Sequence, residues 1–334
     1  MFMRLKLLAI TTVMLFVTAP AFSQEVLNIS SWAPPTHLIN AGVWPTWGKW
    51  IEEATDGRVT TKIEYGLASP LKQFELVRDG VADAAWIFHG YNTRYVATQA
   101  VEMPNLGTSA EAASVAYWRV HQKYLAKADE HKGVTLVGLT SHGPAVIQTK
   151  SPLNSLDDLR GQKIRVPGGV GSSVGKALGV TAVKLPAPKV YEALSTGVAD
   201  GIFMPMETQK SFRLKEVVPH VTIMPGGLYY GSFAFIMNND FLAGLSENDR
   251  NAIIGVSGEK LSQLAGEHWD AADVDGLAAA KEAGTTINTA SAEIHKKYLE
   301  IMASVEQDWV ASVGKAGVDG KAALEELRSI ARSY

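Results

Sequence analysis

The chain has 334 residues, no cysteine and a formal net charge of −3 at pH 7. Without cysteine it has no disulfides, thiol chemistry or cysteine metal sites, and its slightly acidic balance argues against a nucleic-acid partner, which requires a basic patch. A single core rarely grows beyond about 250–300 residues, so this length predicts two domains.

The first 23 residues have the features of a secretory signal peptide. Arg4 and Lys6 precede the apolar run "LLAITTVMLFVT", and small residues stand at Ala21 and Ser23. The run is shorter than the ~20 residues of a membrane-spanning helix. We expect cleavage near Ser23/Gln24 and export. An exported chain without disulfides fits a bacterial periplasm.

The first half of the exported chain alternates strands and helices. The patterns predict a strand at 26–30, a helix from 39 that stops at Asp56-Gly57, a strand at 59–66, a helix at 69–79 and a buried strand at 82–90. Gly80 suits the left-handed position after a helix.

The same order returns further along the chain. It predicts a strand in "KIRVPGG" (163–169), a helix at 172–179, a strand at 182–186, a helix at 187–197 and a strand at 199–205. Such alternation is typical of parallel α/β sheets. The tetrapeptide "GVAD" stands between a helix and a strand in both halves, at 80–83 and 197–200. We interpret this repeat as two similar α/β lobes.

The C-terminal third is mainly helical. Residues 231–246 read as a strand followed by a loop, and 247–283 as one long helix that could span both lobes. Ser246 and Asp249 resemble a capping box at its start. The segments 291–313 and 319–332 are amphipathic and predict two further helices.

Two glycine motifs overlap after the strand that contains Arg165. "Gly169-Val170-Gly171" begins a dinucleotide fingerprint but lacks its third glycine. "GSSVG" (171–175) matches the nucleophile elbow of α/β hydrolases. Ser173 would be the nucleophile, with Asp200 and His220 as partners, which leaves an exported serine hydrolase as an alternative.

Other polar residues suggest binding rather than catalysis. His89 and His142 each precede a glycine at a predicted strand end, where α/β proteins bind ligands. No histidine spacing indicates a metal site, and no cofactor is expected. Arg165 allows two interpretations: the solvent-facing side of a strand, or a cation held for an anionic ligand.

The segment 158–205, "DLRGQKIRVPGG…VGKALGVTAVKLPAPKVYEALSTGVADGIFMP", closely resembles the central motif of TRAP-transporter periplasmic solute-binding proteins. The "EEATDGRV" and "VRDGVAD" segments resemble the family's N-terminal half. The resemblance implies a two-lobed α/β fold with mixed sheets, hinge strands, a long lobe-spanning helix and a ligand cleft. It implies a binding protein and not an enzyme, with TRAP membrane permease subunits as partners.

The resemblance also implies that Arg165 clamps a ligand carboxylate. The family's Asn falls on Met204, and residues 142–149 lack the second Arg that many relatives have. One cation beside apolar candidates favours a monocarboxylate with an aromatic or apolar body. A lactam, a 2-oxo acid and a C4-dicarboxylate remain alternatives. The expected ligand-binding residues are Arg165, Trp32, His37, Phe88, His89, His142, Met204, Glu207, Tyr229 and Tyr230.

The expected division of the chain follows from this comparison. Lobe I would comprise 24–143 and about 231–272, and lobe II would comprise 144–230 and about 273–334. The ligand cleft would lie between them.

Overall fold

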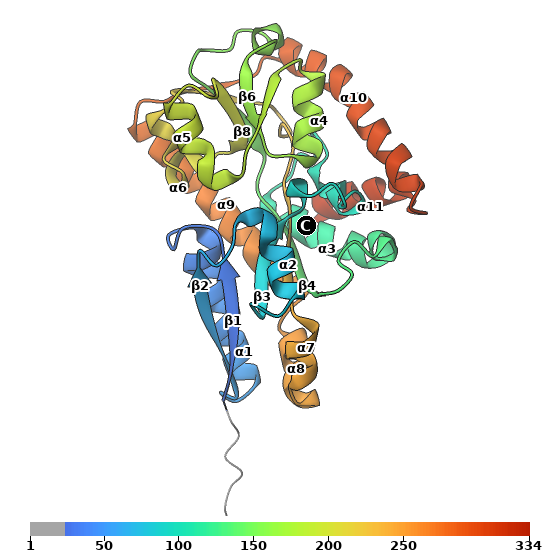
Figure 1. Ribbon diagram of the computed structural model, residues 1–334. Helices are drawn as coiled ribbons and strands as arrows, with labels where there is room; N and C mark the ends of the chain where they lie inside the picture. Colours follow the sequence, from blue (N-terminus) through green and yellow to red (C-terminus); the bar gives the residue numbers. More distant parts are fainter. Residues whose placement is uncertain (1–23) are drawn as a thin grey trace, which may run out of the picture.

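A computed structural model describes residues 24–334 (Figure 1). The expected signal peptide lies outside these residues. Eleven strands in this part of the chain form two sheets: β1 (Glu25–Ser31), β2 (Val59–Tyr65), β3 (Ala84–Phe88), β4 (Thr135–Ser141), β5 (Ala145–Thr149), β6 (Lys163–Val166), β7 (Thr181–Lys184), β8 (Gly201–Pro205), β9 (His220–Ile223), β10 (Ser232–Met237) and β11 (Thr286–Thr289).

The first lobe contains a five-stranded sheet in the order β2-β1-β3-β10-β4. Strand β1 pairs in parallel with β2 and β3, whereas β10 is antiparallel to β3 and β4. The N-terminal β-α-β order therefore gives the parallel strands that the sequence predicts. The antiparallel β10 comes from much later in the chain.

The second lobe contains a six-stranded sheet in the order β11-β9-β5-β8-β6-β7. Strand β6 is parallel to β7 and β8, and β5 is antiparallel to β8 and β9. Both sheets are mixed. The register places Arg165 of β6 beside Val183 and Ile202, in the interior of this sheet.

Helices cover both sheets in the part of the chain described. The α-helices are α1 (Trp44–Ala54), α2 (Gln73–Arg78), α3 (Ala110–Val120), α4 (Gly169–Ala177), α5 (Val190–Ser195), α6 (Thr208–Ser211), α7 (Asn239–Gly244), α8 (Glu247–Gly255), α9 (Glu259–Glu282), α10 (Ala292–Gly314) and α11 (Gly320–Ser333). None of the helices among residues 24–334 is long and apolar enough to cross a membrane.

The chain passes between the sheets three times. Residues 142–144 join β4 to β5, residues 224–231 join β9 to β10, and α9 leads from the first lobe to β11. Helix α9 contacts α3 and β4 in one lobe and α6 in the other. In Figure 1, α9 runs behind the junction between β1–β4 below and β6, β8 and α4 above. The expected hinge strands and lobe-spanning helix are confirmed.

The C-terminal prediction was wrong in two places. The stretch 247–283 is not one helix, because the chain breaks between α8 and α9. Gly258 has a φ of +66° and donates its N–H to the carbonyl oxygen of Val137 at 2.7 Å, which pulls the backbone out of helical geometry. The expected loop after β10 contains α7, whose first turn is capped by the Asn238 side chain.

Helix α4 also begins earlier than expected, at Gly169 instead of 172. Gly168, just before it, has a φ of +108°, which only glycine adopts readily. The turn after β6 is therefore short, and α4 starts close to Arg165.

Candidate ligand-binding site

Arg165 is the only arginine or lysine side chain that is almost fully buried in the part of the chain described. Only 1% of its surface is exposed. Its Nε and Nη2 donate to the carbonyl oxygen of Leu185 at 3.0 and 2.9 Å. None of the ion pairs formed among residues 24–334 includes Arg165. The guanidinium is therefore buried without an anionic partner, which is unfavourable by several kcal/mol.

Arg165 faces a small cavity of about 40 Å³. Residues from both lobes line it: Trp32, His37, Trp86, Phe88, Tyr91, His142, Arg165, Pro167, Ala187, Met204, Pro205, Glu207, Phe212, Tyr229, Phe233 and Trp269. The lobes are closed on each other here, and the walls are mostly aromatic.

The aromatic wall is a connected set of stacked and edge-on rings. Trp32 stacks on Trp86 with ring centroids 4.1 Å apart, and Phe233 stacks on Trp269 at 5.5 Å. The Trp32 indole donates to the carbonyl oxygen of Trp86 at 3.1 Å. Such a wall suits the flat apolar body of an aromatic ligand.

Two histidines and one carboxyl group lie on the cavity wall besides Arg165, and all three are buried. Burial lowers the pKa of His37 to about 3 and that of His142 to about 4, so both are neutral at pH 7. Burial, reinforced by Asp273, raises the pKa of Glu207 to about 8 despite a hydrogen bond from Ser211. Glu207 is therefore mainly protonated at neutral pH, and Arg165 carries the charge of the cavity.

The structure brings eight of the ten expected site residues to this cavity: Arg165, Trp32, His37, Phe88, His142, Met204, Glu207 and Tyr229. It does not bring His89 and Tyr230 there. The Nε2 atoms of His89 and His131 lie 2.9 Å apart in the interior, and the Tyr230 hydroxyl donates to the carbonyl oxygen of Thr108 at 2.8 Å. Tyr229 and Tyr230 are neighbours in the chain and point to different surroundings.

Sequence reasoning missed several wall residues. Trp86 stands two positions before Phe88 in β3, so strand alternation places both side chains on one face and could have found it. Tyr91 follows that strand and accepts a hydrogen bond from the Ala187 N–H at 2.8 Å. Trp269 lies in α9 and Phe233 in β10, and nothing local in the sequence indicates that they reach this cavity.

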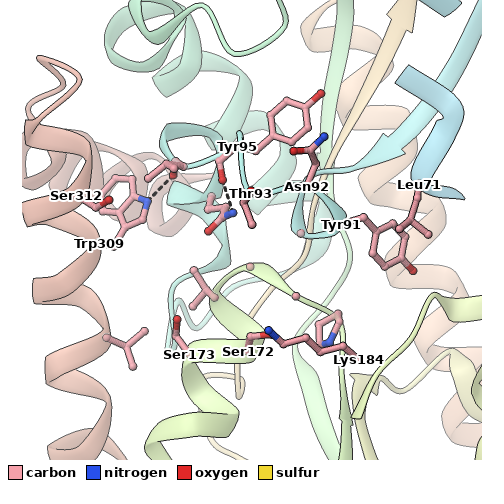
Figure 2. Close-up of a pocket in the computed structure, with 18 of the residues that line it drawn as sticks. Leu71, Tyr91, Asn92, Thr93, Tyr95, Ser172, Ser173, Lys184, Trp309 and Ser312 are labelled. Atoms are coloured by element: carbon pink, nitrogen blue, oxygen red, sulfur yellow. Dashed lines mark hydrogen bonds between the residues drawn. The ribbon is translucent and has the colours of Figure 1, made fainter. Parts of the chain in front are cut away.

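A second cavity, of about 560 Å³, lies on the other side of Tyr91 and Pro167, which line both. Figure 2 shows Tyr91, Asn92 and Thr93 on one side of it, Ser172, Ser173 and Lys184 on the other, and Trp309 on α10. Arg165 does not line this cavity.

Ser173 lies in this larger cavity and not at a nucleophile elbow. It is the fifth residue of α4, whereas an elbow requires the serine on the tight turn after the strand. No hydrogen bond among residues 24–334 joins Ser173 to Asp200 or His220. Asp200 accepts a hydrogen bond from the Lys163 N–H instead. The geometry required for the hydrolase alternative is absent from the described residues.

The closed lobes meet closely beside the site. A Cβ atom on Gly168 would lie 1.9 Å from the carbonyl oxygen of Gly90, which follows β3 in the other lobe. Nearby, the Glu102 carboxylate accepts hydrogen bonds from the Val170 N–H at 2.8 Å and from the Ser232 hydroxyl. Glu102 therefore links the start of α4 to the strand that returns to the first lobe.

Two mixed α/β lobes, joined by hinge strands and a long helix and closed over a cavity with one cation, define a two-lobed solute-binding protein. Residues 29–312 match the family model of bacterial extracellular solute-binding proteins, family 7 (DctP). The chain belongs to this family, the TRAP periplasmic solute-binding proteins.

Three solved structures of this family are especially similar. A TRAP periplasmic solute-binding protein from Bordetella bronchiseptica, with bound (R)- and (S)-mandelate, is 39% identical and has a TM-score of 0.90 over 92% of this chain and 99% of that one. A marine metagenome protein, described as specific for aromatic acid ligands and solved with 3-hydroxybenzoate, is 31% identical (TM-score 0.87; 93% and 99% covered). A Rhodoferax ferrireducens protein with copurified benzoate is 27% identical (TM-score 0.86; 92% and 98% covered).

Proposed function

We propose that this protein captures an aromatic or apolar-bodied organic monocarboxylate in the periplasm, through a carboxylate clamp formed by Arg165. The observation that carries the proposal is the buried Arg165 without an anionic partner among residues 24–334, at an otherwise neutral and aromatic cavity. A carboxylate would supply the missing charge in a geometry that matches the guanidinium fork.

The aromatic wall supports an aromatic body for the ligand. The three similar structures carry mandelate, 3-hydroxybenzoate and benzoate, each of which has one carboxylate and one benzene ring. A C4-dicarboxylate would bring a second charge to a cavity where Arg165 is the only cation on the wall. Lactams and 2-oxo acids remain weaker alternatives because neither needs so extensive an aromatic surface.

Binding would be coupled to closure of the lobes. Trp32, Phe88 and Trp86 come from the first lobe, and Arg165 and Met204 come from the second. A ligand that contacts both walls binds the closed state more tightly and so shifts the population toward it. The closed receptor would then deliver the ligand to the TRAP membrane permease. We also propose that the chain passes from one lobe to the other at 143/144, 230/231 and about 272/273.

A thermal-shift panel of organic acids tests this function. We expect benzoate and its relatives to raise the melting temperature, because a ligand that binds only the native state stabilises it by mass action. Succinate, pyroglutamate and 2-oxo acids serve as the competing classes. A panel in which only neutral sugars or amines raise the melting temperature would contradict the proposal.

The non-enzymatic nature of the protein is part of the same proposal. Ser173 is the one residue that the sequence offers as a nucleophile. We expect no labelling of Ser173 by a fluorophosphonate probe, since no base activates it among the described residues. Stoichiometric labelling that Ser173→Ala abolishes would instead support the hydrolase.

A further inference from the structure

The cavity has a second polar end, formed by His37 and Glu207. Both residues line the cavity and are 2% exposed. Thr36 and Leu38, which flank His37, line a neighbouring hollow together with Glu207, so the two side chains belong to the same end.

The hydrogen bonds of His37 determine which of its nitrogens is free. The Ile39 N–H donates to His37 Nδ1 at 3.3 Å, so Nδ1 is an acceptor. A neutral imidazole then carries its proton on Nε2. No hydrogen bond among residues 24–334 engages this Nε2–H. The ring lies between Trp86 and Trp269, with centroids 5.3 and 5.5 Å away, so its orientation is held by packing.

Glu207 is fixed by contacts on its other sides. Its N–H donates to Asp273 Oδ1 at 2.8 Å, and the Ser211 hydroxyl donates to Oε2. Helix α9 packs so closely here that a Cβ on Gly276 would lie 2.6 Å from the Cα of Glu207. Oε1 has no hydrogen-bond partner among residues 24–334. The carboxyl group is therefore held rigidly with one oxygen free.

His37 Nε2 and Glu207 Oε1 have no hydrogen-bond partner among residues 24–334, and neither atom is fully enclosed by protein, so a polar ligand group in the cavity can bond to them. The carboxylate of the ligand is already assigned to Arg165. A hydroxyl group both donates and accepts, so it can satisfy His37 Nε2–H and Glu207 Oε1 together. A second carboxylate would bring a second negative charge to a cavity wall on which Arg165 is the only cation.

We infer that His37 and Glu207 form a hydroxyl-recognition subsite, so that the preferred ligand is a hydroxylated aromatic monocarboxylate. This inference rests on the proposed function and adds to it. It assigns discrimination between acids to these two residues and the anchoring of every acid to Arg165.

The test compares size-matched ligands by isothermal titration calorimetry of the purified protein. The three hydroxybenzoates are each compared with the methylbenzoate substituted at the same position, and mandelate with 2-phenylpropanoate, in which a methyl group replaces the hydroxyl. Because a site built to bind a hydroxyl is penalised when the hydroxyl is missing, at least one hydroxylated acid should bind about ten-fold more tightly than its partner.

Two variants assign the effect to the subsite. His37→Phe keeps an aromatic ring between the two tryptophans and removes the donor, while Glu207→Gln keeps the shape of the side chain. We expect either variant to reduce the preference for the hydroxyl to less than about three-fold. Ser173→Ala, in the larger cavity, serves as the matched control and should retain the full preference.

The outcomes separate the two claims. Equal affinities for hydroxylated and methylated acids in the unmodified protein would overturn the hydroxyl subsite and leave the proposed function intact. A preference that survives in both His37→Phe and Glu207→Gln would also overturn it. No binding of any aromatic acid would contradict the proposed function itself. Circular dichroism checks that each variant is folded. If one of the two variants does not fold, the hydroxyl preference of the other tests the subsite.

Discussion

The Arg165 guanidinium donates two of its hydrogen bonds to a single acceptor, the carbonyl oxygen of Leu185, at 3.0 and 2.9 Å. This contact orients the side chain but brings no negative charge to it. The main chain that follows β7 thus aims a buried cation at the cavity. A carboxylate ligand would supply the countercharge and stabilise the closed lobes.

Closure depends on the close approach of Gly168 to Gly90. We predict that Gly168→Ala weakens binding of an aromatic acid by about ten-fold or more, because its Cβ would lie 1.9 Å from the Gly90 carbonyl oxygen in the closed state. The φ of +108° and ψ of −169° add strain of about 1–3 kcal/mol for a non-glycine residue. Calorimetric titration measures the affinity.

Gly161→Ala is the matched control for this prediction. Gly161 has a φ of +75°, but a Cβ atom added there would meet no other atom within 4 Å. It should lower the melting temperature through backbone strain and leave the affinity unchanged. Equal losses of affinity in the two variants would show that strain, and not lobe contact, explains the effect.

The buried Glu207 should make stability depend on pH. Its pKa is raised from 4.5 to about 8 in the folded protein, so folding favours its protonated form. Its contribution to stability is fully present below pH 4.5 and is lost as the pH rises toward 8, by at most about 1.4 kcal/mol per pH unit. The stability of Glu207→Gln relative to the unmodified protein should therefore increase between about pH 5 and pH 8.

Urea unfolding at several pH values measures this difference. Glu300→Gln, on the exposed face of α10, is the control and should run parallel to the unmodified protein. If the stability of Glu207→Gln has the same pH dependence as that of the unmodified protein, Glu207 is ionised in the folded state. The conclusion that the cavity wall is neutral apart from Arg165 would then be wrong.

The interior histidines should have the opposite effect. Burial lowers the pKa of His131 to about 3, with His121 and Arg94 adding to the shift. The unfolded chain binds a proton near pH 6.5 and the folded protein does not, so stability present above pH 6.5 is lost as the pH falls toward 3. As the pH falls from about 6.5 to 4.5, the free energy of unfolding of His131→Gln should decrease less than that of the unmodified protein. This comparison of slopes does not depend on how stable the variant is at pH 7.

Urea unfolding across this pH range checks the slope. The Nε2 atoms of His89 and His131 lie 2.9 Å apart, a contact that requires at least one neutral ring and so agrees with the shift that burial causes. A slope identical to that of the unmodified protein would mean that His131 is protonated in the folded state.

Local patterns predict the strands and helices of this protein well, since they follow from alternation and helical periodicity. The break at Gly258 could not be predicted, because four glycines stand between residues 247 and 283 and only the contact with Val137 selects one. Helix α7 had a local signal in the sequence, because Asn238 is a typical residue before the first turn of a helix. Its side-chain oxygen accepts a hydrogen bond from the Phe241 N–H, three residues later.

The site divides in the same way. Arg165 could be found because a distinctive motif surrounds it, and Trp86 could have been found from Phe88 by strand alternation. His89 and Tyr230 stand beside residues of the site in sequence, yet one bonds to His131 and the other to Thr108. Trp269 reaches the cavity only because α9 crosses both lobes, which is a tertiary relationship that one sequence does not display.

The most direct test is calorimetric titration of the Arg165 variants with an aromatic monocarboxylate that binds the unmodified protein. Arg165→Ala should weaken binding by about 100-fold or more, since it removes the charged partner of a desolvated carboxylate. Arg165→Lys should restore little, because an ammonium group lacks the planar fork. Arg160→Ala, an exposed arginine paired with Asp157, should bind normally. Unchanged affinity in both Arg165 variants would contradict the account.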